Sequence, residues 1–288
     1  MLKKWVLPIG LVCMFALSVA AHAGYPMKVK DARGKAVTIK AKPVRIVSLT
    51  PSNTEILFAL GLDQRIVGVT KYCNYPARAM KKAKIGDMAI SVEAVVALKP
   101  DLVVAHALVN DSVISALEKL GLTVFAVDPK TISQLTCDIR TLGKITARTK
   151  TAESVVKKMQ RKIAAVKSSR AKKKQKNVLV VIQADPLWAA GPHTFIDEMI
   201  GLAHAKNVAR DARPGFVTFS RELAVSRNPD VIVVGSKGDE RFFLTSPAWK
   251  TTPAAKNKRV YVINNDFLVR PGPRLADGLN ALAKALDR

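Results

Sequence analysis

The sequence predicts an α/β protein with two similar lobes, each containing a mainly parallel sheet, joined by one long helix. Three observations predict this fold. Strand-like and helix-like segments alternate with short connections, which is typical of a parallel sheet covered by helices. One sequence pattern occurs in each half of the chain. A single uninterrupted amphipathic stretch separates the halves.

The repeated pattern is SVEAVVALKPDLVV, residues 91–104, and SRELAVSRNPDVIVV, residues 220–234. In both copies a serine precedes a glutamate by two residues, and a Pro-Asp pair begins seven residues after the glutamate. A serine there can cap a helix, and Glu93 and Glu222 then lie in the first helical turn, where the helix dipole favours a negative charge. The equal offset to Pro-Asp indicates two related lobes that arose by duplication.

The first 23 residues are typical of a cleavable signal peptide. Lys3 and Lys4 precede an apolar core at residues 5–20, and Ala21-His22-Ala23 forms an A-x-A cleavage site. We expect a free periplasmic protein rather than a lipoprotein, because Val12 stands before Cys13 where a lipid-attachment site has a small residue. The predicted divisions are 1–23 for the signal, 24–148 for the N-terminal lobe, 149–170 for the linking helix and 171–288 for the C-terminal lobe.

The elements of the N-terminal lobe follow from short apolar runs and cap residues. Strands are expected at residues 46–49, 65–70 and 122–128. A helix is expected to begin in PSNTEILFALG, where Ser52 and Glu55 have capping-box spacing. A second helix should be capped near Asp111 and end at Gly121.

The second half repeats this plan. NVLVVI at residues 177–182 predicts a strand, and HTFIDEMIGL predicts a helix with Thr194 as its cap. A late strand is expected at residues 259–264.

The linking helix is predicted from an apolar stripe at helical spacing: Val155, Val156, Met159, Ile163 and Val166. About 18 helical residues span about 27 Å, enough to act as a stiff connection. Two lobes joined this way leave a cleft, and ligands of parallel α/β sheets bind beyond the carboxyl ends of the strands. We therefore expect a ligand cleft between the lobes.

The loops that follow the predicted strands contain aromatic and polar side chains. Aromatic faces with a few polar groups suit a large, flat, partly apolar ligand. The residues concerned are Tyr72, Tyr75, His106, Trp188, Phe216, Phe267, Arg270 and Arg274.

The formal net charge is +25, and removal of Lys3 and Lys4 leaves 45 basic and 22 acidic residues, or +23. Such a charge favours solubility or an anionic partner, so a polyanion-binding protein is one alternative. The dense basic run at residues 170–176 contains no aromatic residue, so we interpret it as a linker and expect no nucleic-acid binding. Cys73 and Cys137 could pair in an oxidising compartment or stay free.

An enzyme is not expected. His106, His193 and His204 lie in no catalytic or zinc-binding motif, and the sequence has no phosphate-binding loop. It also offers no clear cluster of metal-ligating residues, so no metal site and no resident cofactor are expected.

Four segments together resemble a known family: RIVSLTPSNTEILFALG, VGVTKYCNYP, SVEAVVALKPDLVVA and RPGPRLADGL. They are similar to the periplasmic substrate-binding proteins that feed ABC importers of cobalamin, haem and ferric siderophores, and most similar to the cobalamin-binding members. The resemblance implies a monomeric receptor that binds a corrinoid between its lobes and delivers it to membrane permease subunits. A haem or ferric-siderophore receptor is the alternative.

The resemblance also implies roles for individual residues. The implied ligand-binding residues are Ser52, Asn53, Tyr72, His106, Trp188, Phe216, Asp266, Phe267 and Arg270. His106 stands where cobalamin binders have a tryptophan, and Asp87 stands where haem binders place a tyrosine ligand. Tyr72 and His106 could each ligate iron or cobalt. Glu93 and Glu222 correspond to the glutamates with which this family docks onto its permease.

Overall fold

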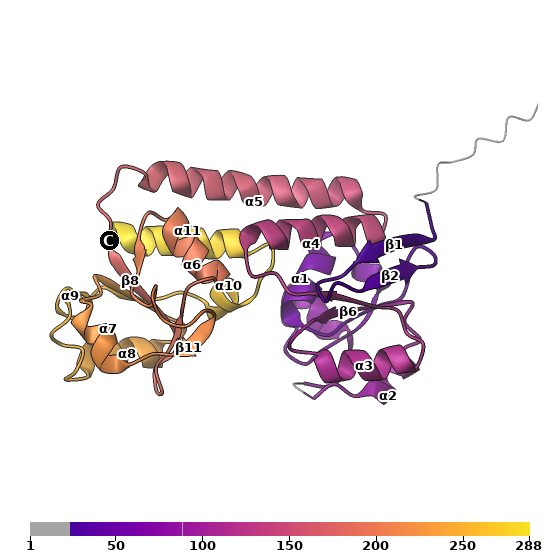
Figure 1. Ribbon diagram of the computed structural model, residues 1–288, viewed down its shortest axis with the longest axis horizontal. Coiled ribbons are helices and arrows are strands. Elements are labelled where there is room, and N and C mark those ends of the chain that lie inside the picture. Colours follow the sequence, from indigo (N-terminus) through magenta and orange to yellow (C-terminus); the bar gives the residue numbers. More distant parts are fainter. Residues whose placement is uncertain (1–23, 88) are drawn as a thin grey trace, which may run out of the picture.

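The computed structural model describes residues 24–87 and 89–288. Figure 1 shows two lobes side by side, with the long helix α5 (Thr149–Arg170) lying along one edge of the molecule across both of them. The predicted two-lobe α/β architecture is confirmed. The predicted signal peptide lies outside the described residues. Within the described part of the chain, no helix is long and apolar enough to cross a membrane.

The N-terminal lobe contains a five-stranded, fully parallel sheet in the order β5-β4-β3-β6-β7. A separate antiparallel hairpin of β1 and β2 precedes it. The strands are β1 (Met27–Lys30), β2 (Ala36–Ile39), β3 (Ile46–Ser48), β4 (Ile66–Val69), β5 (Ala83–Lys84), β6 (Leu102–His106) and β7 (Val124–Val127). The helices are α1 (Pro51–Ala59), η1 (Asp63–Arg65), η2 (Ala77–Lys81), α2 (Val92–Ala97), α3 (Asp111–Lys119) and α4 (Ile132–Ile145).

The C-terminal lobe has a six-stranded mixed sheet. Strands β8, β12 and β13 are parallel and β10 adds to β8, whereas β9 and β11 extend the sheet with antiparallel pairs. The strands are β8 (Asn177–Gln183), β9 (Trp188–Ala190), β10 (Lys206–Asn207), β11 (Phe216–Thr218), β12 (Val231–Val234) and β13 (Val260–Val262). The helices are α6 (Phe195–Leu202), α7 (Arg221–Ser226), α8 (Lys237–Thr245), α9 (Pro253–Lys256), α10 (Asn265–Val269) and α11 (Leu275–Asp287).

The central strands of both sheets are buried on both faces. Every residue of β3 and β12 is buried, as expected for parallel strands covered by helices on each side. Beyond the C-terminal sheet, Trp249 is fully buried and packs edge-on against Phe243 with 4.6 Å between ring centroids. Each lobe has one apolar cluster of its own, and a third, larger cluster continues from one lobe to the other beneath α5.

Helix α5 is held by both lobes. It packs against α4 of the N-terminal lobe and α11 of the C-terminal lobe, with Val156 and Met159 buried. At its end, buried Arg170 donates from Nη1 to the Asp287 carboxylate at 2.6 Å and from Nε to the Ala203 carbonyl at 3.1 Å. These bonds fasten the carboxyl end of α5 to the C-terminal lobe.

The predicted serine and threonine caps are confirmed at three helices. The hydroxyls of Ser91, Ser220 and Thr194 each accept a hydrogen bond from the backbone N–H three residues later, at 3.0 to 3.1 Å. The helix at Asp111 begins where predicted, although its cap residue, Asn110, makes no side-chain capping bond.

The capping box predicted for Ser52 and Glu55 is wrong. Helix α1 begins after Thr50, which has an extended backbone and no side-chain capping bond. The Glu55 carboxylate instead pairs with arginines of the other lobe. A buried carboxylate gains more from two guanidinium groups than from one backbone N–H, because charge-assisted bonds are the stronger kind.

Candidate functional site

A cavity of about 600 Å³ lies between the two lobes. Its volume is in the usual range for small-molecule sites. The N-terminal wall is formed by His106, Leu108, Val109, Asp128, Pro129 and Lys130. The C-terminal wall is formed by His193, Thr194, Phe195, Pro214, Gly215, Phe216, Val269 and Pro271.

Sheet topology explains why these loops meet. In the N-terminal sheet, residues at and after the carboxyl ends of the neighbouring strands β6 and β7 line the cavity. The crevice beyond the carboxyl ends of the strands is the usual ligand site of an open parallel sheet. Leu108 and Val109 are 69% and 61% exposed, so this wall presents apolar surface to the cavity.

On the opposite wall, the pairing of β9 and β11 forms an aromatic surface. Phe216 pairs with Ala190 and Trp188 pairs with Thr218, so the two aromatic residues lie diagonally on one face of the ribbon. They are 40% and 41% exposed, whereas Val217, on the alternate face, is buried. Trp188 and Phe216 also line a neighbouring hollow of about 540 Å³ that continues this surface. Phe216 is supported edge-on by Phe195 at 6.1 Å.

His106 belongs to a charged cluster on the N-terminal wall. Its Nε2 atom lies 3.5 Å from an Asp128 carboxylate oxygen, and the same oxygen accepts a bond from Lys130 Nζ at 2.6 Å. Burial lowers the pKa of the His106 imidazole; the Asp128 charge opposes this shift and the Lys130 charge adds to it. A neutral imidazole at the cavity wall is the form that binds metal ions.

Ser52 and Asn53, expected in a cleft loop, lie in the first turn of α1 and are more deeply buried than the aromatic residues. Ser52 is 6% exposed and its hydroxyl lies 3.2 Å from that of Thr50. Asn53 is fully buried, and its side-chain amide has no hydrogen-bond partner among the described residues. Tyr72, in contrast, is 50% exposed.

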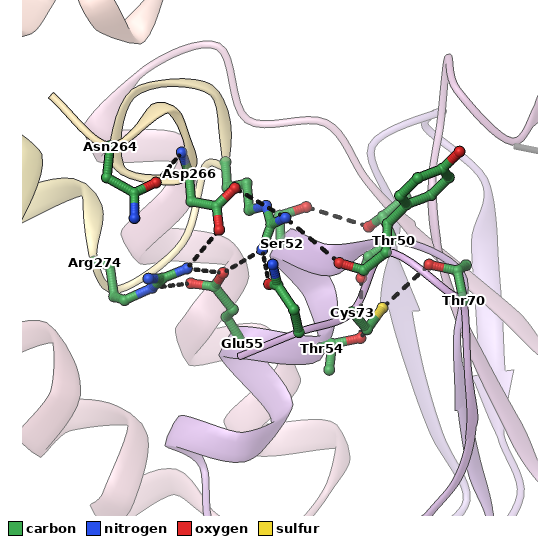
Figure 2. Close-up of polar contacts among 12 residues, drawn as sticks. Thr50, Ser52, Thr54, Glu55, Thr70, Cys73, Asn264, Asp266 and Arg274 are labelled. Carbon is green, nitrogen blue, oxygen red and sulfur yellow. Dashed lines mark hydrogen bonds and ion pairs between the residues drawn. The ribbon is translucent and has the colours of Figure 1, made fainter. Parts of the chain in front are cut away.

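Asp266, Phe267 and Arg270 lie at the junction of the lobes. Figure 2 shows Asp266 and Arg274 of the C-terminal lobe beside Glu55 of α1. Arg270 Nη2 lies 2.9 Å from Asp266 and its Nη1 lies 3.3 Å from Glu55. Phe267 packs under Arg274, whose guanidinium carbon is 5.1 Å from the ring centroid. The polar groups predicted as ligand contacts are thus engaged with one another.

Glu93 and Glu222 have matching surroundings in the two lobes. The hydroxyls of Ser91 and Ser220 donate to them at 2.9 and 2.8 Å, and both carboxylates are exposed. A hydrogen bond from each glutamate's own backbone N–H, followed by the serine bond, lowers the pKa of both side chains. Their helices, α2 and α7, lie on the side of the molecule away from α5, one in each lobe (Figure 1).

A sequence model of the periplasmic binding proteins matches residues 46–267. The chain belongs to that family. It is 37% identical to YvrC of Bacillus subtilis, an uncharacterised ABC transporter substrate-binding lipoprotein, over 91% of this chain and 86% of the other. It is 28% identical to a cobalamin-binding protein of Halobacterium salinarum, over 91% and 74% of the two chains.

A solved structure of another binding protein also has this fold. The haem-binding protein RhuT of Roseiflexus, in its apo form, superimposes with a TM-score of 0.75 at 29% identity, covering 84% of this chain and 97% of that one. The resemblance expected from the four sequence segments is therefore confirmed. This periplasmic binding protein is of the ABC-transporter type, and its family consists of substrate-binding transport proteins rather than enzymes.

Of the implied ligand residues, the structure brings His106 and Phe216 into one cavity and Trp188 beside it. Ser52, Asn53, Tyr72, Asp266, Phe267 and Arg270 do not line that cavity. Sequence reasoning missed Leu108, Val109 and Lys130, although the first two follow the aliphatic run at the end of the first repeat, which forms β6 in the structure. An exposed Leu-Val pair directly after a buried strand was the available signal.

Two further features concern metals and thiols. The described residues contain no group of three or more His, Cys, Asp or Glu side chains that could hold a metal ion. Cys73 and Cys137 are both free, the first buried and the second exposed on α4. Cys73 instead contacts the hydroxyls of Thr54 and Thr70 at 3.1 and 3.2 Å, as Figure 2 shows.

Proposed function

We propose that this protein binds a corrinoid of the cobalamin type between its lobes and delivers it to the permease of an ABC importer. The observation that carries the proposal is the exposed aromatic face of Trp188 and Phe216 beside a cavity whose opposite wall presents the exposed apolar side chains of Leu108 and Val109. A large, flat ring system can stack on such a face. The similarity to cobalamin-binding proteins over most of the chain supports the same ligand class.

Haem or a ferric siderophore is the second candidate, and the His106 cluster favours it. Burial lowers the pKa of the His106 imidazole and so favours the neutral form that binds iron, and Lys130 is 52% exposed and can meet a carboxylate. Arg270 and Arg274 are less suited to that role, because their side chains are only 14% and 13% exposed and pair with buried Glu55. Lys130 is therefore the cation expected to distinguish an anionic ligand from a neutral corrinoid.

The proposal includes location and partners. We infer that the protein works in the periplasm after removal of residues 1–23, as a monomer. Glu93 and Glu222 are proposed to contact one permease subunit each. One exposed anchor per lobe suits a permease with twofold symmetry, and charge pairs at such an interface mainly set register and encounter rate. The bound ligand brings its own cobalt or iron, so no resident cofactor is proposed.

The ligand can be identified by visible absorption. The purified protein is incubated separately with cobalamin, haemin and a ferric siderophore, desalted, and its spectrum recorded. We expect the cobalamin spectrum to be retained by the wild type. Retention of haemin alone would favour the second candidate, and retention of none would contradict both.

The stacking surface is tested on the same samples. Trp188→Ala and Phe216→Ala should each weaken ligand binding by about 1 kcal/mol or more, because truncation removes aromatic contact from a mainly apolar site. Both side chains are about two-fifths exposed, so circular dichroism should show an intact fold. Tyr261→Ala, a partly buried tyrosine on β13, serves as a control outside the cavity. Wild-type affinity in the Trp188→Ala/Phe216→Ala double variant would exclude this surface.

A further inference from the structure

One buried carboxylate accepts hydrogen bonds from two arginines across the junction of the lobes. Glu55 lies on α1 of the N-terminal lobe, and its side chain is 2% exposed. Arg274 donates from Nη2 to Oε1 at 2.5 Å and from Nε to Oε2 at 2.8 Å. Arg270 adds a bond from Nη1 to Oε1 at 3.3 Å. Both arginines belong to the C-terminal lobe, so these bonds, including the bidentate contact of Arg274, join the two lobes.

The same arginines also hold the loop after β4. Arg270 donates from Nη1 to the Asn74 side-chain oxygen at 2.6 Å and from Nη2 to the Tyr72 carbonyl at 3.4 Å. The guanidinium of Arg274 lies 3.9 Å from the centroid of the Tyr75 ring. The contacts therefore reach from the lobe junction to a loop that carries Tyr72.

The geometry makes the lobe arrangement and the pairing of Glu55 interdependent. A buried carboxylate without a partner is strongly unfavourable, because it has lost its hydration. Both cationic partners of Glu55 come from the other lobe, so separating or rotating the lobes would leave its charge unpaired. Asp266 pairs with both arginines from their own lobe and aligns them toward Glu55. Figure 2 shows Arg274 between the carboxylates of Glu55 and Asp266.

We propose that Glu55 is a positioning residue for ligand binding: it holds Arg270 and Arg274 across the junction and thereby sets the width of the cleft before a ligand arrives. The consequence for affinity rests on the proposed function of the cleft. If loss of the contacts of Glu55 with Arg270 and Arg274 reduces the population of the binding-competent lobe arrangement to about one tenth, the apparent Kd rises about tenfold. The ligand's own contacts need not change.

The lobe arrangement can be measured without ligand. A nitroxide label on native Cys137, exposed on α4, and a second on Lys237→Cys, on α8, report the distance between the lobes. Cys73 is 1% exposed and should not react. Double electron–electron resonance on the ligand-free exported protein should give a narrow distance distribution for the wild type and a broader one for Glu55→Gln.

The matched control is Glu118→Gln. Glu118 also accepts two cations, Arg33 and Lys35, both at 2.7 Å, but all three residues belong to the N-terminal lobe. This variant should keep the narrow distribution. If Glu118→Gln broadened it as much as Glu55→Gln did, the effect would reflect a general loss of stability and the proposal would be overturned.

If Glu55→Gln does not fold, Arg274→Lys serves as the second variant that tests the proposed role of Glu55. Lysine keeps the positive charge but cannot make the bidentate contact, so an intermediate broadening and a smaller loss of affinity are expected. An unchanged distribution in the folded variants would overturn the proposal. Because the distances are recorded without ligand, a failure of the corrinoid assignment would leave this result standing. With the ligand identified, Glu55→Gln should bind it about tenfold more weakly.

Discussion

Asp138 is a residue whose surroundings in the fold disfavour the ionised form of its carboxyl group. It lies on α4, and its pKa is raised from 3.8 to about 7, first by burial and then by repulsion from Asp128. Asp128 in turn contacts His106 and Lys130 on the cavity wall. The protonation of Asp138 near neutral pH therefore affects the charge of the cluster that faces the ligand site.

This shift predicts a pH-dependent stability. The folded-state pKa is above the unfolded value, so the folded protein binds the proton more tightly, and the associated stability is lost as the pH rises from about 4 through about 7. Asp138→Asn, which cannot ionise, should be more stable than the wild type at pH 8 by about 2 kcal/mol. This is roughly half of the limit of about 4 kcal/mol set by a shift of about three pKa units, because the side chain keeps some contact with water.

Urea unfolding at pH 4, 6 and 8 tests the prediction. The difference between Asp138→Asn and the wild type should shrink as the pH falls and vanish near pH 4. Asp185→Asn is the control, since the Asp185 side chain is 71% exposed. A stability difference that stayed the same at all three pH values would show that Asp138 does not titrate as described.

At the scale of elements, α2 and α7 show how a short helix can present one charge. Each has six residues, a serine cap and a glutamate in its first turn. Such helices gain little from propensity and depend on packing, so the positions of their glutamates are set by the sheets behind them. The Pro-Asp pair after each helix leads directly into a buried strand, β6 or β12. The repeat therefore places equivalent carboxylates on one side of the molecule.

We expect substitution of the glutamates on these two helices to reduce transport without affecting ligand binding. Glu93→Ala with Glu222→Ala should leave the Kd for ligand unchanged but strongly reduce uptake and binding to the reconstituted permease, with a partial loss for each single change. Removing each glutamate should cost its helix only about 0.3–1 kcal/mol, because the favourable interaction with the dipole is modest.

Uptake by cells that express each variant as their sole copy provides the measurement. Glu153→Ala is the control, because Glu153 is a half-exposed glutamate on α5, on the other side of the molecule. Normal uptake by the double variant would leave the repeat as a sign of common ancestry alone.

At the scale of the whole molecule, the chain is strongly positive, and the cavity between its lobes is lined by both apolar and charged side chains. The net charge of residues 24–288, +23, is spread over both lobes, and α5 alone carries Lys150, Lys157, Lys158, Arg161, Lys162, Lys167 and Arg170. Such a surface attracts polyanions whatever the cleft binds. Salt concentration distinguishes polyanion binding from ligand binding in the cleft, because only polyanion binding depends on the release of counterions.

The expected salt dependence follows. Corrinoid affinity should change by less than about twofold between about 50 and 200 mM salt, whereas a polyanion contacting several basic residues should lose about 10³-fold over the same range. Titration with the corrinoid and with heparin at both salt concentrations makes the comparison. A steep loss of corrinoid affinity would instead indicate that the ligand is held mainly by charge.

Local signals in the sequence were sufficient for much of the fold. Apolar runs predicted β3, β7, β8 and β13, because the strands of a sheet covered by helices are rich in apolar side chains. Ser91, Thr194 and Ser220 predicted helix starts, because a cap bonds a backbone N–H only three residues away. The resemblance of four segments to one family identified the two-lobe architecture as a whole.

Only the tertiary structure showed which side chains contact each other across the junction of the lobes. Glu55 has capping-box spacing from Ser52, yet its carboxylate pairs with Arg270, 215 residues away along the chain. The diagonal placement of Trp188 and Phe216 depends on the register of β9 and β11, and the raised pKa of Asp138 depends on how α4 is buried. Caps and strands are determined by neighbours in the chain, whereas ion pairs, aromatic surfaces and pKa shifts depend on distances that only the packed chain establishes.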